Sequence, residues 1–290
     1  MPDYFDSFQQ KDYNKWNSKR KTAENRMNKI VDFHAHIYPE KIADKAAQNV
    51  GEFYGIEMDH GGSVAELIES GNEGHVTHFV VQSVATKPQQ VQSINSFIAQ
   101  TCKENGGRLI GLGTLHPDME KPEQEIDRCI QIGLKGIKLH PDCQKFNMDD
   151  SRMMPIYKAL EGRLPILFHC GDYRYDYSHP RRLAHVLDTF PKLDVVAAHF
   201  GGWSVYDLAV EYLENRRCWL DTSSALAFIG SRRGRELIHL YGADRMVFGT
   251  DFPMWGHKQE LERFYDLGLT EEENRKILYE NACNVLKTDI

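Results

Sequence analysis

The sequence lacks three features that would assign it to a specialised class of protein. None of its apolar runs approaches the roughly 18 residues of a membrane span, so we expect no membrane partner. It has no basic cluster and a formal net charge of -7, which argues against nucleic acid as a partner. Its six cysteines form no CxxC pair, so we expect free thiols in a reducing compartment rather than a disulfide framework.

Residues 1–28 lack an apolar segment of the kind that a secretory signal requires. They are polar and rich in Lys, Asn and Gln, and Asp3, Asp6 and Asp12 argue against an organellar transit peptide. We interpret them as a polar N-terminal arm and expect a cytoplasmic protein. Residues 29–290 are expected to form a single domain.

After residue 28, short apolar runs alternate with amphipathic segments. The runs are 30–36, 77–84, 109–115, 136–140, 165–170, 193–199, 218–223 and 245–251. The helix-like segments between them are 93–105, 122–133, 151–162, 180–190, 203–215, 233–242 and 257–268. Eight such repeats in a chain of 290 residues predict an α/β fold of the (β/α)8 barrel type, which needs about 250 residues.

Two segments extend this basic pattern. Residues 37–76 separate the first two runs, so we expect a long insertion after the first strand that shapes access to a site. Residues 270–287 predict extra C-terminal helices, with Thr270 as N-cap and Glu273 completing a capping box.

The first strand candidate ends in His34 and His36. Side chains on a strand alternate between faces, so these two imidazoles share a face and could bind one metal ion. Taken alone, the pair is more readily interpreted as two ordinary histidines on a half-buried strand. Further polar residues end other runs: His140, His169, His199 and Asp251. In a barrel these ends open onto one face, where active sites lie, and such a set suits a catalytic divalent ion.

These motifs resemble the amidohydrolase superfamily, in the branch of the carboxymuconate-semialdehyde and resorcylate decarboxylases. The resemblance covers about residues 29–288. It is carried by DFHAH (32–36), GIKLHPD (136–142), ILFHCGD (166–172), AAHFGG (197–202), FGTDFP (248–253) and ILYENACNVL (277–286).

The resemblance implies that His34, His36, His169 and Asp251 bind a divalent metal ion, with His199 beside it. Zinc is the expected ion, with manganese or iron as alternatives. Lys138 shares a strand face with His140, and binuclear members of the superfamily carry a carbamylated lysine on the fourth strand. We favour one ion, in which case Lys138 or His140 binds an anionic group of the substrate, or Lys138 pairs with a carboxylate near the barrel mouth.

The stretch after the fifth strand candidate is rich in tyrosine and includes Tyr173 and Arg174. A guanidinium group binds carboxylates in a bidentate fork, so we expect these two residues to contact a carboxylate-bearing substrate. An aromatic surface loop is the alternative interpretation.

The leading hypothesis is a metal-dependent hydrolase that opens a lactone, ester or amide of a small acid with metal-activated water. Asp251 and His199 are its expected catalytic residues. The alternative is non-oxidative decarboxylation on the same site. The expected partner is a small-molecule substrate, and a homodimer is one option for the assembly.

Overall fold

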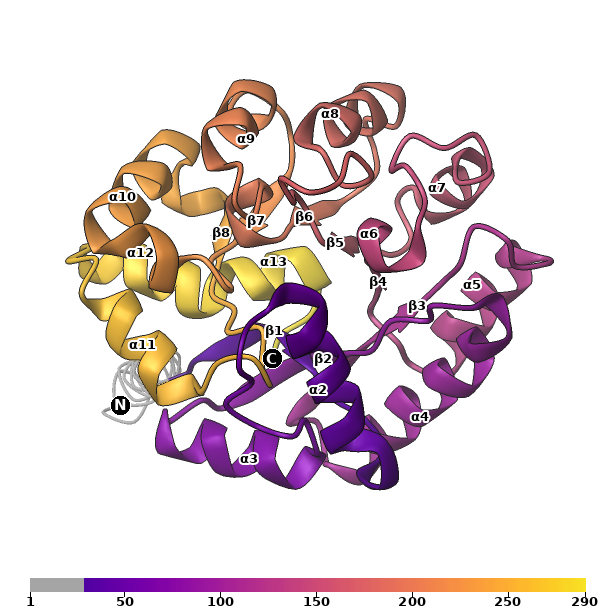
Figure 1. Cartoon of the computed structure of the whole chain (residues 1–290), viewed down its shortest axis with the longest axis horizontal. Helices are drawn as coiled ribbons and strands as arrows, with labels where there is room; N and C mark the ends of the chain where they lie inside the picture. Colours follow the sequence, from indigo (N-terminus) through magenta and orange to yellow (C-terminus); the bar gives the residue numbers. More distant parts are fainter. Residues whose placement is uncertain (1–28) are drawn as a thin grey trace, which may run out of the picture.

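The computed structural model describes residues 29–290 and shows eight parallel strands surrounded by helices (Figure 1). The strands follow one another in chain order, which confirms the predicted (β/α)8 barrel. They are β1 (Val31–His36), β2 (His78–Gln82), β3 (Leu109–Thr114), β4 (Gly136–Leu139), β5 (Ile166–Phe168), β6 (Val195–Ala197), β7 (Trp219–Asp221) and β8 (Met246–Val247). The arm predicted over residues 1–28 lies outside the described residues.

The ring closes between β8 and β1 through the loop that follows β8. The Phe33 amide donates to Phe248 O at 2.8 Å, and the Asp251 amide donates to His34 O at 2.7 Å. A parallel bridge also pairs Ala35 with Phe252. The last strand segment is therefore anchored to the strand that carries the two histidines.

The outer helices occupy the predicted segments. They are α4 (Val91–Glu104), α5 (Pro122–Gln131), α7 (Met154–Leu160), α8 (Pro180–Thr189), α9 (Tyr206–Leu213), α10 (Leu226–Tyr241) and α11 (His257–Tyr265), with a short α6 (Pro141–Gln144) after β4. The helix α10 begins earlier than predicted because two helical segments join across Gly230, whose φ is 70°. Among these residues, no helix is long and apolar enough to cross a membrane.

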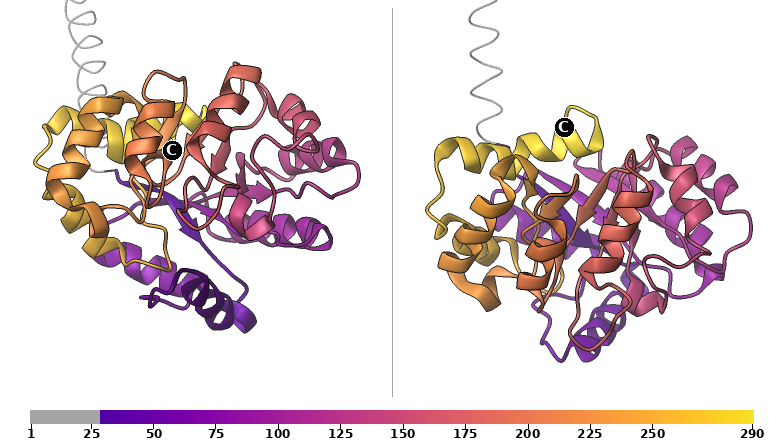
Figure 2. Two further views of the ribbon diagram at one scale, coloured as in Figure 1. Left: turned by 45° about the horizontal axis from the view of Figure 1, so that its top comes forward. Right: turned by 90° about the horizontal axis from the view of Figure 1, so that it is seen from above.

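The predicted insertion after β1 contains η1 (Glu40–Ile42), α2 (Ala43–Tyr54) and α3 (Val64–Glu73). The helix α3 begins with a capping box between Ser63 and Glu66 and packs against α11. Figures 1 and 2 show α2 standing out from the barrel, on the side away from the C-terminal helices. The insertion therefore lies at the end of the barrel where the strands terminate.

The C-terminal helices close the opposite end of the barrel. They are α12 (Glu271–Arg275), the π-helical turn η5 (Lys276–Glu280) and α13 (Asn281–Leu286), and α12 begins with the predicted Thr270–Glu273 capping box. Leu286 and Val285 pack in one apolar cluster with Val31 and Phe33 of β1. Burial of each large apolar side chain stabilises the folded state by about 1.5–3 kcal/mol. The packing of α13 against β1 is therefore a substantial part of the barrel core.

Candidate active site

The two histidines of β1 face the inside of the barrel because the strand is irregular. Its register against β2 shifts between Asp32 and Ala35. Phe33 belongs to the inner apolar cluster, whereas Ala35 belongs to the outer one. The Nε2 atoms of His34 and His36 lie 3.2 Å apart, so the prediction that these side chains share a face is confirmed.

Asp251 reaches the same point from the loop after β8. Its Oδ1 atom lies 3.3 Å from His34 Nε2 and 3.5 Å from His36 Nε2. Its φ is 63°, a left-handed conformation that Asp tolerates better than most residues. Ser224 donates its hydroxyl hydrogen to Asp251 Oδ2 at 2.7 Å, which leaves Oδ1 directed at the histidines.

Asp32 holds the two ligand-bearing segments together. Its Oδ1 atom accepts the His34 amide at 2.9 Å and the Thr250 amide at 3.0 Å. Its Oδ2 atom accepts the Thr250 hydroxyl at 2.6 Å and contacts His257 Nε2 at 3.0 Å. Because Asp32 and His257 are fully buried, these bonds fix the spacing between His34 and Asp251 with little competition from water.

Hydrogen bonds on the far side of three imidazole rings determine which nitrogen is left bare. His34 Nδ1 lies 2.8 Å from Asp221 Oδ2, and His199 Nδ1 lies 2.9 Å from Ser223 O. His169 Nε2 lies 2.9 Å from Gly171 O. Carbonyl and carboxylate oxygens only accept, so each of these nitrogens carries the hydrogen, and the opposite nitrogen presents a lone pair.

The bare nitrogens face one another, which is the arrangement that a cation requires. His169 Nδ1 and His199 Nε2 lie 3.1 Å apart, and two lone pairs at that distance repel unless a proton or metal ion lies near them. His34 Nε2 and His36 Nε2 also lie only 3.2 Å apart, with Asp251 Oδ1 at 3.3 Å and 3.5 Å from them. This donor set therefore fits a divalent ion, with the Asp221 carboxylate orienting the His34 imidazole from behind.

The electrostatics of the site favour unprotonated ligands. Burial lowers the pKa of His36 to about 4, and the attraction of Asp251 only partly offsets this. Burial acts to raise the pKa of Asp251, but His34, His199, His36 and Lys138 together lower it to about 2. At neutral pH the imidazole is neutral and the carboxylate is charged, which are the forms that bind metals.

Residues 29–290 contain three groups of possible ligands, and within each group the ligand atoms lie within 4.8 Å of one another. The groups are His34–His36–Asp251, His34–His199–Asp221 and His140–Asp142–His169. The predicted ligand His169 thus belongs to a group separate from the other three, although it lines the same cavity and contacts His199.

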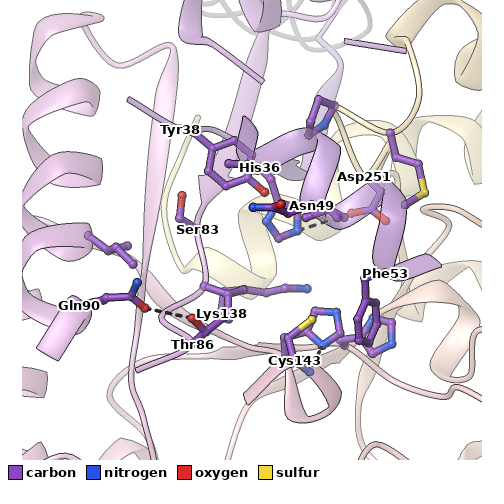
Figure 3. A pocket seen from close by; sticks show the side chains of 18 of the residues that line it. His36, Tyr38, Asn49, Phe53, Ser83, Thr86, Gln90, Lys138, Cys143 and Asp251 are labelled. Carbon is purple, nitrogen blue, oxygen red and sulfur yellow. Dashed lines mark hydrogen bonds and ion pairs between the residues drawn. The ribbon is translucent and has the colours of Figure 1, made fainter. Parts of the chain in front are cut away.

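Lys138 extends into the barrel from β4 and is fully buried (Figure 3). Its Nζ atom lies 3.0 Å from His34 Nε2. No carboxylate among the described residues comes within 4.0 Å of it. Burial lowers its pKa to about 8, and Asp251 and Asp221 act in the opposite direction.

His140 directly follows β4 and lies beside His169. Their rings stack 3.9 Å apart at an interplanar angle of 7°. The Tyr54 hydroxyl, from α2, lies 2.7 Å from His140 Nε2. Tyr54 thus connects the insertion to the strand ends, a contact for which the sequence offers no signal.

Arg174 and Tyr173 lie apart from the other predicted site residues, because neither lines the cavity that those residues share. Arg174 pairs with Asp172 at 2.7 Å, donates to Phe53 O at 2.7 Å and stacks on the Phe53 ring. Its guanidinium is therefore already bound, and its position attaches the loop after β5 to α2. Tyr173 is 74% exposed.

A cavity of about 670 Å³ lies above the strand ends. It is lined by every predicted site residue except Arg174 and Tyr173: His34, His36, Lys138, His140, His169, His199 and Asp251. These residues form the polar floor of the cavity. Sequence reasoning missed Asp221, although it ends β7 and so carries the same positional signal as the others.

A family model described as Amidohydrolase matches residues 31–288. Because this match spans most of the sequence, the chain belongs to the amidohydrolase family, as its motifs indicated.

Two relatives are named as decarboxylases. The 2-amino-3-carboxymuconate-6-semialdehyde decarboxylase of Dictyostelium discoideum is 30% identical over 168 residues, 45% of this chain and 45% of the relative. The gamma-resorcylate decarboxylase of Polaromonas sp. is 22% identical over 269 residues, 71% of this chain and 80% of the relative. The first match therefore spans less than half of that relative's length.

Two solved structures share the fold. A dihydroxybenzoic acid decarboxylase from Polaromonas sp., with bound manganese and the inhibitor 2-nitroresorcinol, has a TM-score of 0.69 at 16% identity and covers 90% of this chain and 97% of its own. A probable 2-pyrone-4,6-dicarboxylic acid hydrolase from Acinetobacter baumannii, with citric acid bound, has a TM-score of 0.65 at 16% identity. Its match covers 89% of this chain and 99% of its own.

Proposed function

We propose that the chain is a divalent-metal-dependent decarboxylase, which removes CO₂ from a small carboxylic acid without a redox step. The observation that carries the proposal is the convergence of His34, His36 and Asp251 within 3.5 Å, beside the buried ammonium group of Lys138. The names of both relatives support decarboxylation over the hydrolysis that we expected first from the sequence.

We assign the metal ion to His34, His36 and Asp251, and we keep His169 Nδ1 as the candidate fourth ligand although it groups with His140 and Asp142 in the structure. A bound divalent ion would supply positive charge that holds and polarises oxygen atoms of the substrate. Zinc fits two or three imidazoles with one carboxylate, and manganese and iron also accept this set. The manganese in the Polaromonas structure makes manganese the first alternative to test.

Lys138 is assigned to the substrate's carboxylate. A buried ammonium without a nearby carboxylate is costly, and an anionic substrate would provide the missing countercharge. This role also places the scissile carboxyl group next to the metal ligands, because Lys138 Nζ contacts His34. A carbamylated Lys138 that bridges two ions is the competing assignment, and two equivalents of bound metal would indicate it.

His199 is assigned to proton transfer. Its Nδ1 atom is anchored to Ser223 O, so its Nε2 atom is held towards the cavity. Because Nε2 presents a lone pair in the resting site, it first takes a proton from a hydroxyl group of the substrate or from water, and then delivers that proton to the carbon that bears the carboxylate. The electrons of the broken carbon–carbon bond then return to the substrate, and CO₂ leaves. Asp251, with a pKa of about 2, is a weak base and is better suited to holding the ion.

Release of CO₂ tests the proposal. We expect the metal-loaded protein to decarboxylate a dihydroxybenzoate. In His199→Asn we expect kcat to fall by about 10²- to 10⁴-fold while the bound metal is retained. Asp207→Asn, at an exposed position on α9, is the control. Absence of CO₂ from a panel of hydroxybenzoates and unsaturated dicarboxylic acids would reject decarboxylation.

Hydrolysis remains the second candidate because the same cavity could position water next to the metal ligands. The fold similarity to the Acinetobacter baumannii protein, named as a hydrolase, favours testing it. Hydrolysis of a pyrone dicarboxylate opens its lactone ring to a single open-chain acid. The reaction can be followed by the loss of the pyrone's ultraviolet absorbance. Turnover of the lactone without CO₂ release would establish hydrolysis in place of decarboxylation.

A further inference from the structure

The cavity continues from its polar floor into a region between two helices, which we call the apolar arm. Its walls are side chains of α2, α4 and the loop after β2, namely Ala46, Val50, Val84, Ile94 and Phe97. All five are half-buried, so the arm is in part open to solvent.

The helix α2 contributes its larger apolar side chains to this cavity rather than to the protein core. Its fully buried residues are Ala43, Ala47 and Gly51, all small. Val50 lies on the cavity side instead, whereas Phe53 lines another part of the cavity and already stacks on Arg174. An apolar side chain such as Val50 that lines an open space is expected to be buried against a ligand.

The side chains that define the arm carry no charge, although Asn49 of α2, Ser93 of α4 and Lys145 also line the cavity, and two polar groups lie at the outer edge of the arm. Thr86 and Gln90 are exposed and bond to each other at 3.2 Å. Figure 3 shows this pair on the side of the cavity away from Asp251 and Phe53, with Lys138 between the two sides. A ligand that reaches from the floor to this edge therefore passes from charged to apolar to neutral polar surroundings.

We propose that the substrate carries an uncharged apolar substituent, alkyl or aryl, which occupies the apolar arm while its carboxylate lies on the polar floor. The position of the carboxylate on the polar floor rests on the function proposed above. A cavity of about 670 Å³ falls within the range of roughly 300–1,000 Å³ typical of sites for drug-sized ligands. A single-ring acid would leave the arm filled with weakly bound water, which an apolar group displaces favourably.

Paired ligands that differ only in the substituent provide the test. The acids are 2,6-dihydroxybenzoate and its 4-pentyl derivative, compared by kcat/KM. Their decarboxylated counterparts, resorcinol and 5-pentylresorcinol, are compared by calorimetry on the metal-loaded protein. A fully buried methylene is worth about fourfold in affinity, which corresponds to about 0.8 kcal/mol. We expect the pentyl compounds to be favoured at least tenfold in both measurements.

A variant that fills the arm should remove this preference. Ala46→Phe places a ring between α2 and α4, so the pentyl-to-parent ratio should fall towards one. Gln48→Phe adds the same ring to the exposed face of α2, outside the cavity, and should keep the wild-type ratio. Equal binding of the two phenols by the wild type, or a ratio unchanged in Ala46→Phe, would overturn the apolar arm. A binding preference without CO₂ release from either acid would support the arm and reject decarboxylation.

Discussion

The Nδ1 atom of His34 lies 2.8 Å from Asp221 Oδ2, on the opposite side of the imidazole ring from the Nε2 atom that faces His36 and Asp251. Both side chains are almost completely buried. Asp221 also accepts the His199 amide at 2.8 Å, so one carboxylate orients two residues of the floor.

The first prediction concerns this carboxylate. Asp221→Asn can donate from its amide nitrogen, which would favour the wrong tautomer of His34 and weaken metal binding by about 10- to 100-fold. Competition with a fluorescent chelator measures the change. Asp188→Asn, at a largely exposed ion pair with Arg216, should not change the affinity. Unchanged metal affinity in Asp221→Asn would exclude His34 as a ligand.

Removal of the buried ammonium should weaken substrate binding. Lys138→Met keeps the side-chain length but leaves the substrate's carboxylate without a partner, so KM should rise by roughly 30-fold, or about 2 kcal/mol. Bound metal should stay near one equivalent. Lys158→Met, at an exposed site, serves as the control. A normal KM together with a halved metal content would instead indicate the carbamylated, binuclear site.

Gly249 provides a steric test of the site. A Cβ atom there would lie 2.8 Å from the Cβ of His34 and 3.2 Å from the Cβ of Ser223. We expect Gly249→Ala to displace His34 and to lower metal affinity by about tenfold or more. In Gly256→Ala the nearest contact is 3.3 Å, to His60 Nε2, so its affinity should be close to wild type. Equal affinities in the two variants would mean that the position of His34 does not limit metal binding.

Glu260 should make stability depend on pH. Burial raises its pKa to about 7, although Arg263 opposes the shift. The folded state therefore holds a proton that the unfolded state releases from about pH 4.5 upwards. This contribution to stability is complete below pH 4.5 and is lost as the pH rises to about 7, with a total of about 3 kcal/mol.

Urea unfolding at several pH values can isolate this effect. Glu260→Gln cannot ionise, so its free energy of unfolding should fall less than that of the wild type between pH 4.5 and 7. Glu262 lies two residues further along α11, on its exposed face, so Glu262→Gln should follow the wild-type profile. Parallel profiles for wild type and Glu260→Gln would show that Glu260 ionises normally in the folded state.

The barrel and the polar floor could be predicted from the sequence because both follow simple periodicities. Strand alternation placed His34 and His36 on one face, and the rule that barrel strands end at one rim grouped His140, His169 and His199. Asp221 could have been found in the same way, since it also ends a strand.

The role of Arg174 could not be predicted, because it depends on where a loop meets an inserted helix. The local pattern shows a guanidinium among tyrosines, but not that Asp172 and Phe53 O already bind it. Tyr54 is a similar case: its contact with His140 spans 86 positions and depends on the path of the insertion. Such contacts are determined by tertiary packing rather than by periodicity.

The division of the donor atoms between the first strand and the loop after the last has a consequence for biosynthesis. A nascent chain that has not yet emerged beyond β8 presents only the two imidazoles of β1, because Asp251 and the neighbouring Thr250, which bonds to Asp32, are still missing. With the ion assigned as proposed, tight metal binding would be a late event in folding, and it would stabilise only chains in which β1 and the loop after β8 have come together. Metal binding would then distinguish complete barrels from partial ones.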